Sequence, residues 1–291
     1  MWEVVTEYKC LCAEGPVWDS KNSCIYWIDI LSGDIHRYSV VSATLVTYNT
    51  GEKIGAISLR NNTGLIAALK TGIYEIDFEK KQKRLIADPE EEIPGNRFND
   101  GKCDARGRFW AGTMDDGNGI AKAGTLYVLD ENKKISPVIA DLTISNGLAW
   151  SIDNKNFYHI DTPTRKVTAF DFDLDTGTIG NKVDVINIPD SSGAPDGMTI
   201  DAEGMLWIAH WDGWKISRWN PQNGKLLCEI KLPVSRVTSC TFGGHSWTDI
   251  YITSAKAGLS IEALEEQPLA GSLFVIRDSG FKGIETSRFR G

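Results

Sequence analysis

The chain is built from short segments in which apolar residues alternate or cluster, separated by turns rich in Gly, Asn and Asp. Runs of this length bounded by such turns are typical of β-strands. Examples are residues 24–29, 65–69, 125–129 and 166–171. The apolar spacing of an amphipathic helix is almost absent, and the best helix candidate is the short stretch 260–266. The pattern therefore predicts an all-β protein.

The strand-like segments recur as a unit. A polar residue and a Gly precede a short apolar strand, as in 146–151 and 196–201, and a strand rich in Trp, Tyr and Ile follows after a turn. The period is about 40–50 residues, each holding three or four strands. This pattern predicts a six-bladed β-propeller with a central channel, formed by residues 1–291 as a single domain. A β-sandwich is the main rival, but it explains the repeat poorly.

The last unit has fewer strands of its own, in residues 249–253 and 272–276. We expect the N-terminal segment 4–8 to supply the missing strand and to close the ring. Closure of this kind removes open sheet edges, which otherwise promote aggregation.

The position just before the first strand of each unit is the strongest candidate for chemistry. That strand lines the channel of a propeller, so residues at its start meet at one channel mouth. The position holds Glu14, Asn146 and Asp196, with Ile54 in the second unit and residues 99–101 in the third. Turn chemistry accounts for Asn or Asp beside Gly, but Glu is a poor turn former. Crowded carboxylates and amides need a cation between them, which predicts a divalent metal with oxygen ligands, with zinc and iron left open.

The composition of the chain limits the classes of molecule that we expect it to bind. The net charge of −8 disfavours nucleic acid and anionic membranes. No apolar run approaches the roughly 20 residues that a membrane span needs, and the N-terminus lacks a signal-peptide pattern. The six cysteines contain no C-x-x-C pair and are expected to be free thiols. We therefore expect a cytoplasmic protein.

Several motifs, in order along the chain, resemble the regucalcin/gluconolactonase/luciferin-regenerating-enzyme family, the sugar lactonases related to senescence marker protein. The motifs that carry this resemblance are Ala13–Trp18, Asn96–Lys102, Ala111–Met114, Ile144–Leu148, Pro195–Met198, Phe242–Gly244 and Pro268–Phe274. They cover essentially the whole chain. The resemblance implies a six-bladed propeller, in agreement with the repeat.

The resemblance also implies residue roles and an activity. The metal ligands would be Glu14, Asn146 and Asp196, and the substrate contacts would include Arg97 and Asn99. Members of the family hydrolyse aldonolactones such as gluconolactone and xylonolactone. Their single divalent metal varies among calcium, zinc, manganese and ferrous iron.

One loop departs from the family pattern. Vertebrate-type members carry a substrate-binding Glu shortly after the Ala-Gly-Thr-Met stretch, whereas residues 115–119 of this chain read Asp-Asp-Gly-Asn-Gly. We favour Asp116 as the substrate contact, with Asp115 as the alternative. The Trp-rich stretch 210–214 also departs from the vertebrate pattern, and either lines the pocket mouth or packs in the outer blade.

As a mechanistic hypothesis, the metal polarises the lactone carbonyl. Asp196 both ligates the metal and accepts a proton from the attacking water. Arg97 and Asn99 would hold the substrate, although a surface ion pair with residues 90–92 is a second interpretation of Arg97. His36 and His159 lie in strand-like runs and are expected to be hydrogen-bonded structural residues.

Two other functions compete with a lactonase. One is a calcium-binding regulatory protein without significant turnover, and the other is a metal-dependent esterase or phosphotriesterase. The combination of Arg97, Asn99 and the acidic loop favours the lactonase, because a binding protein needs no sugar contacts. The expected partner is a small sugar lactone, and the expected state is a monomer or weak homodimer.

Overall fold

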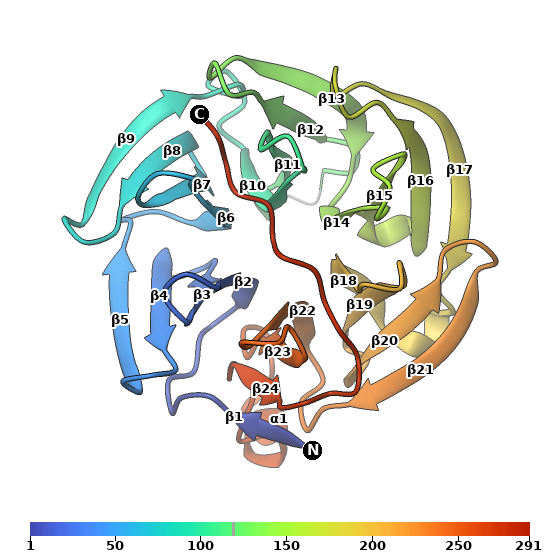
Figure 1. Ribbon diagram of the computed structural model, residues 1–291. Helices are drawn as coiled ribbons and strands as arrows, with labels where there is room; N and C mark the ends of the chain where they lie inside the picture. Colours follow the sequence, from blue (N-terminus) through green and yellow to red (C-terminus); the bar gives the residue numbers. More distant parts are fainter. Residues whose placement is uncertain (118–119) are drawn as a thin grey trace.

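The computed structural model describes residues 1–117 and 120–291, and it confirms the six-bladed β-propeller. Six four-stranded antiparallel sheets surround a central channel (Figure 1). Blade one contains β2 (Ala13–Asp19), β3 (Cys24–Asp29), β4 (Asp34–Ser39) and β5 (Thr44–Asn49). Blade two contains β6 (Ile54–Leu59), β7 (Leu65–Leu69), β8 (Gly72–Asp77) and β9 (Gln82–Ala87). Blade three contains β10 (Asn96–Cys103), β11 (Phe109–Asp115), β12 (Gly124–Leu129) and β13 (Ile135–Leu142).

Blades four to six follow the same order from the channel outward. Blade four contains β14 (Ser145–Trp150), β15 (Asn156–Asp161), β16 (Lys166–Phe172) and β17 (Ile179–Asn187). Blade five contains β18 (Ala194–Ile200), β19 (Leu206–Trp211), β20 (Lys215–Asn220) and β21 (Lys225–Lys231). Blade six contains β22 (Val237–Gly243), β23 (Asp249–Ser254), β24 (Phe274–Ile276) and β1 (Trp2–Val4). Short 3-10 turns occupy Thr162–Thr164 and Asp190–Ser192.

The N-terminal strand closes the ring as predicted, but its bounds differ. The strand is Trp2–Val4, paired with Phe274–Ile276, whereas we expected residues 4–8. After Val5, whose amide donates to the Leu273 carbonyl at 2.9 Å, the chain leaves the sheet. The predicted helix is confirmed as α1 (Ile261–Glu266), whose N-cap Ser260 accepts a hydrogen bond from the Ala263 amide.

The hydrophobic cores lie between the blades. Each of the six core clusters is shared by two neighbouring sheets: for example, Tyr26 and Ile28 of blade one pack with Ile57 and Leu65 of blade two. The same arrangement repeats around the ring back to blade one. A single blade therefore cannot bury its faces without its neighbours, which is the usual energetics of a repeat architecture.

Every innermost strand carries a β-bulge near its start. The register against the second strand shifts in all six blades, for example between Glu14 and Val17 and between Asn146 and Leu148. The predicted metal ligands therefore lie inside the first strands at the bulges, and not just ahead of the strands as expected. A bulge redirects side chains that would otherwise follow the strand alternation, and in each blade it lies in the part of the innermost strand nearest the same channel mouth.

The C-terminal segment after β24 crosses the face of the ring over the channel (Figure 1). It bridges to Asp201 at Gly283 and to Arg60 at Phe289, and both partners directly follow the ends of innermost strands. The segment therefore crosses the channel end opposite to the bulges. The end that holds Glu14, Asn146 and Asp196 is not crossed by it.

Phe289 anchors this crossing segment, because its ring is fully buried between blades two and three. Truncating a buried Phe leaves a cavity, and such changes destabilise proteins by about 3–5 kcal/mol. We expect Phe289→Ala to lower the free energy of unfolding by about 3 kcal/mol, measured by urea denaturation. Ile284→Ala, on the same segment but 41% exposed, is the control and should change it by less than about 0.5 kcal/mol. Equal effects of the two changes would refute the anchoring role.

Candidate metal centre

The structure places Glu14, Asn146 and Asp196 at one channel mouth, each at least nine-tenths buried. Burial, together with repulsion from Asp196 and Asp100, raises the pKa of Glu14 well above its usual value. Burial and repulsion from Asp100 likewise raise the pKa of Asp196, although a hydrogen bond from Asn146 opposes the shift. Carboxylates from separate blades thus lie close enough to disfavour each other's ionisation.

A chain of hydrogen bonds links the predicted substrate contacts to the predicted ligands. Arg97 donates to the Asn99 side-chain oxygen at 2.8 Å, and Asn99 donates to the Asn146 side-chain oxygen at 3.2 Å. The Asn146 amide in turn donates to Thr162 at 2.9 Å, whose hydroxyl donates to the Pro195 carbonyl beside Asp196. The amide of Asn146 is therefore oriented with its oxygen on the Asn99 side, away from Thr162.

Asp116 lies beside Arg97. Its Oδ1 is 3.3 Å from Arg97 Nε and 2.6 Å from Lys53 Nζ, and its Oδ2 is 2.7 Å from Lys70 Nζ. Burial would raise its pKa, but the hydrogen bonds from Lys53 and Lys70 outweigh burial and lower it. Asp115 is buried within β11, opposite Asn96. The acidic loop thus brings Asp116, rather than Asp115, to Arg97; residues 118–119 of that loop lie outside the described residues.

The structure does not place Arg97 in a surface ion pair with residues 90–92, which was the second interpretation of this residue. Glu90 accepts hydrogen bonds from Thr113, Asn96 and Tyr127, and the recorded ion pair of Arg97 is with Asp116. The guanidinium is largely buried, which lowers its pKa despite the surrounding negative charge. A buried cation directed at the mouth is suited to a ligand and is not a solvated surface pair.

The residues at the mouth fit a hard divalent cation. Within residues 1–117 and 120–291 no three His, Cys, Asp or Glu side chains form a metal-binding group. Glu14, Asp196 and the Asn146 amide supply two carboxylates and a neutral oxygen instead. Burial and mutual repulsion raise the pKa values of both carboxylates, and a divalent cation with oxygen ligands would offset that repulsion.

His36 and His159 are held by hydrogen bonds within their blades, as expected for structural residues. His159 in β15 bonds to Ser145 Oγ at 2.9 Å, and His36 in β4 bonds to Thr47 Oγ1 at 2.9 Å and stacks on Trp27. Burial lowers the pKa of His36 to about 4 and that of His159 to about 3. Both rings are therefore neutral at physiological pH.

The lowered pKa of His36 makes stability pH-dependent. As pH falls, the unfolded chain binds a proton near pH 6.5, whereas the folded His36 resists protonation until about pH 4. Stability is therefore lost between pH 6.5 and about 4. Relative to His36→Phe, wild type should lose about 2 kcal/mol between pH 7 and pH 5. Urea titrations at both pH values test this; parallel stability curves would contradict it.

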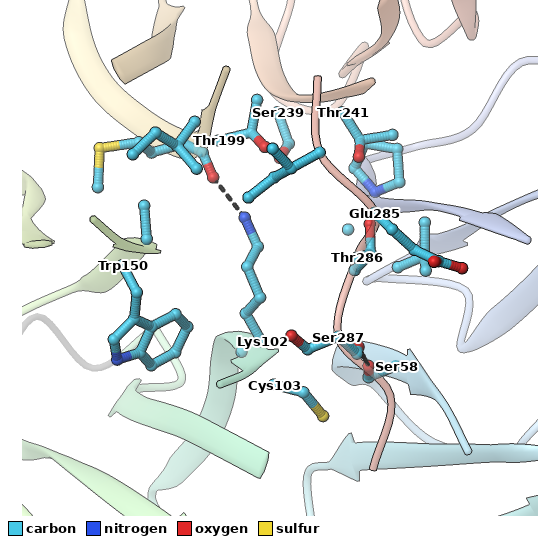
Figure 2. A pocket seen from close by; sticks show the side chains of 18 of the residues that line it. Ser58, Lys102, Cys103, Trp150, Thr199, Ser239, Thr241, Glu285, Thr286 and Ser287 are labelled. Carbon is cyan, nitrogen blue, oxygen red and sulfur yellow. Dashed lines mark hydrogen bonds between the residues drawn. The ribbon is translucent and has the colours of Figure 1, made fainter. Parts of the chain in front are cut away.

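A cavity of about 310 Å³ lies in the channel between the mouth and the crossing C-terminal segment. Figure 2 shows Ser58, Thr199, Ser239 and residues 285–287 around Lys102, which donates to the Met198 carbonyl at 2.6 Å. This cavity does not contain the predicted ligands, although it reaches Gly15 and Asp100 next to them. It is the inner part of the channel rather than the mouth that holds Glu14, Asn146 and Asp196.

The Trp-rich stretch lies at the same end of the ring as Asp196, since Trp211 pairs with Ala194. Trp211 packs under the guanidinium of Arg236 at 4.8 Å, and Trp214 is 43% exposed. Trp211 thus fits the packing interpretation, and a pocket role for Trp214 stays a prediction.

Sequence reasoning missed three participants at the mouth: Lys53, Lys70 and Thr162. Lys53 directly precedes Ile54, the blade-two equivalent of Glu14, so the repeat offset could have identified it. Lys70 follows β7 and Thr162 follows β15, where the second strands return to the same mouth. Turn-flanking Lys and Thr are too common in sequences to stand out without that topology.

Comparison with known proteins agrees with this fold. The family model of the SMP-30/gluconolactonase/LRE-like region matches residues 12–256. Regucalcin of Danio rerio is 39% identical over 290 residues, covering 99% of this chain and 98% of that protein. The chain belongs to the SMP-30/gluconolactonase/LRE-like family.

Solved structures show the same architecture. A luciferin-regenerating enzyme superposes with a TM-score of 0.94 at 29% identity, covering 100% of this chain and 99% of that chain. A calcium-binding protein, regucalcin, from Agrobacterium tumefaciens gives a TM-score of 0.94 at 26% identity, covering 99% and 97% of the two chains. Within the described residues no helix is long and apolar enough to cross a membrane.

Proposed function

We propose that the protein is a metal-dependent lactonase that hydrolyses a sugar lactone, such as gluconolactone or xylonolactone, to the aldonic acid. The observation that carries the proposal is the convergence of Glu14 and Asp196, buried with raised pKa values, beside the hydrogen-bonded series Arg97, Asn99 and Asn146. Membership of a family that includes gluconolactonases supports it.

Glu14, Asn146 and Asp196 would hold the metal, which is calcium, zinc, manganese or ferrous iron. When bound, a divalent ion supplies Lewis-acid polarisation of the lactone carbonyl. Regucalcin from Agrobacterium tumefaciens is named as calcium-binding, which supports a divalent ion at this mouth.

The chain's own groups account for proton transfer and orientation. Water adds to the carbonyl carbon and gives a proton to Asp196, which lies within hydrogen-bonding reach of Asn146 at the mouth. The bond from that carbon to the ring oxygen then breaks, and the ring oxygen takes the proton that Asp196 accepted, which restores the carboxylate. Arg97 and Asn99 hold the carbonyl side or the hydroxyls, and Asp116 on the acidic loop holds other hydroxyls. At neutral pH the acid ionises and releases one proton.

Proton release gives the direct assay. The protein is mixed with a panel of aldonolactones in weak buffer, first with EDTA and then with single metals restored. Turnover that requires the metal is expected for at least one lactone. The absence of metal-dependent turnover on every lactone would refute the enzyme. Calcium binding in that case would favour the second candidate, a calcium-binding protein like its regucalcin relatives.

We further propose that the protein acts on a small molecule alone, without nucleic acid or membrane, as a monomer or weak homodimer. The closed ring supports this, because it pairs the terminal strand β1 within the chain. All six cysteines are free thiols, as predicted, which is consistent with a reducing compartment such as the cytoplasm.

A further inference from the structure

Three cationic side chains surround one carboxylate at the rim of the metal-binding mouth. Lys53 and Lys70 lie 2.6 and 2.7 Å from the two oxygens of Asp116, and Arg97 lies 3.3 Å from one of them. They come from different blades: Lys53 and Lys70 flank the inner strands of blade two, whereas Arg97 belongs to β10 and Asp116 follows β11. We name Lys53, Lys70, Arg97 and Asp116 the rim cluster.

The rim cluster carries more positive charge than its own carboxylate neutralises. The neighbouring Glu52 does not compensate, because it binds Lys83 at 2.5 Å and Thr71 at 2.7 Å. The side chains of Lys53 and Lys70 remain 34% and 36% exposed. An ammonium has three donors, so each lysine retains N–H groups for a ligand after binding Asp116.

The rim cluster is continuous with the proposed reaction site. Arg97 binds Asp116 on one side and donates to Asn99 on the other, and Asn99 contacts Asn146. Lys53 directly precedes Ile54, the bulge position in blade two that corresponds to Glu14 in blade one. A molecule whose carbonyl lies at Glu14 and Asp196 would therefore extend toward the lysines with its far end.

We propose that the rim cluster is a subsite for an oxyanion at the far end of the substrate, so that the preferred substrate is a sugar lactone carrying a carboxylate or a phosphate. This inference rests on the proposed lactonase function. Lys53 and Lys70 bind the oxyanion by charge-assisted hydrogen bonds. Asp116 is the positioning residue, because it holds both ammonium groups at one place and its low pKa keeps it charged.

Kinetics on matched lactones test the subsite. The probes are D-glucono-1,5-lactone, D-glucaro-1,4-lactone and 6-phospho-D-glucono-1,5-lactone, so the two charged lactones also distinguish a carboxylate from a phosphate. Wild type is expected to prefer one charged lactone over the neutral one by at least about tenfold in kcat/KM. Because the charges are partly exposed, this preference should decline as salt is added.

Two variants separate the subsite from general effects of removing a lysine. Lys53→Met combined with Lys70→Met should reduce the ratio of charged to neutral kcat/KM about tenfold. Lys80→Met is the control, since Lys80 also pairs with an aspartate at 3.0 Å in blade two but follows β8 at the opposite end. It should leave the ratio unchanged. A ratio unchanged in the double variant, or a wild type without preference for either charged lactone, would overturn the subsite while leaving the lactonase intact.

A binding measurement covers the case in which no lactone is hydrolysed. Calorimetric titration of the metal-free protein compares D-glucarate, which has two carboxylates, with D-gluconate, which has one. Tighter binding of glucarate that disappears in the double lysine variant would support the subsite even if the proposed catalysis fails. Equal affinities of the two ligands for wild type would contradict it.

Discussion

Asp196→Asn is expected to reduce kcat/KM for lactone hydrolysis by at least about a thousandfold, while the metal-free protein becomes more stable. The loss of activity follows because the variant lacks both a charged ligand and the proton acceptor. The gain in stability follows because burial and Asp100 raise the pKa of Asp196, so its ionised form destabilises the folded state at pH 7. An isosteric neutral amide removes that repulsion, which we estimate at about 1–2 kcal/mol.

Thermal unfolding in EDTA and the proton-release assay measure both effects. A gain of that size should raise the Tm by a few degrees, about 2–4 °C per kcal/mol. Asp184→Asn is the control, because Lys166 binds Asp184 and lowers its pKa. That change should leave activity intact and should not raise the Tm. Full activity of Asp196→Asn would refute its assigned role, and a lower Tm in EDTA would refute the electrostatic account.

Metal binding is expected to stabilise the protein more strongly at pH 8 than at pH 6. Glu14 and Asp196 have raised pKa values, so protons compete with the metal at low pH, and fewer protons have to be displaced as the pH rises. At a metal concentration one hundred times the dissociation constant the stabilisation is about 2.7 kcal/mol. This corresponds to a Tm increase of about 5 °C or more.

Scanning calorimetry with and without calcium or manganese at the two pH values tests this expectation. The variant Glu14→Gln tests the same expectation. It lacks a carboxylate that both binds the metal and competes for a proton. The variant should show a smaller stabilisation and a weaker dependence on pH. A Tm increase in wild type that is independent of pH would place the metal on groups with ordinary pKa values, away from Glu14 and Asp196.

The repeat made the fold predictable from the sequence, because each blade repeats the same succession of turn and strand. The offset of Glu14, Asn146 and Asp196 ahead of their apolar strands placed them at one mouth, and the structure brings them there. Their position inside the strands was not predicted, because a bulge such as that at Gly147 leaves the apolar pattern unchanged. The bounds of the closing strand were also predicted incorrectly, because it is Trp2–Val4 and not residues 4–8.

Other parts of the structure have no repeating pattern in the sequence from which they could be predicted. The C-terminal segment crosses the channel in extended form and is held by single anchors such as Phe289, so nothing repeats. The grouping of Lys53, Lys70 and Asp116 depends on the contact between blades two and three. Long-range pairings of common surface residues cannot be inferred from one sequence, whereas a Glu at a turn position is unusual enough to be noticed.

An anomalous-scattering experiment tests the central claim most directly. Crystals are soaked in manganese, and an anomalous difference map is calculated from data collected near the manganese absorption edge. We predict one strong peak at the channel mouth, about 2.0–2.5 Å from carboxylate oxygens of Glu14 and Asp196 and from the side-chain oxygen of Asn146. A peak elsewhere, or a fully soaked crystal without a peak at these three residues, would contradict it.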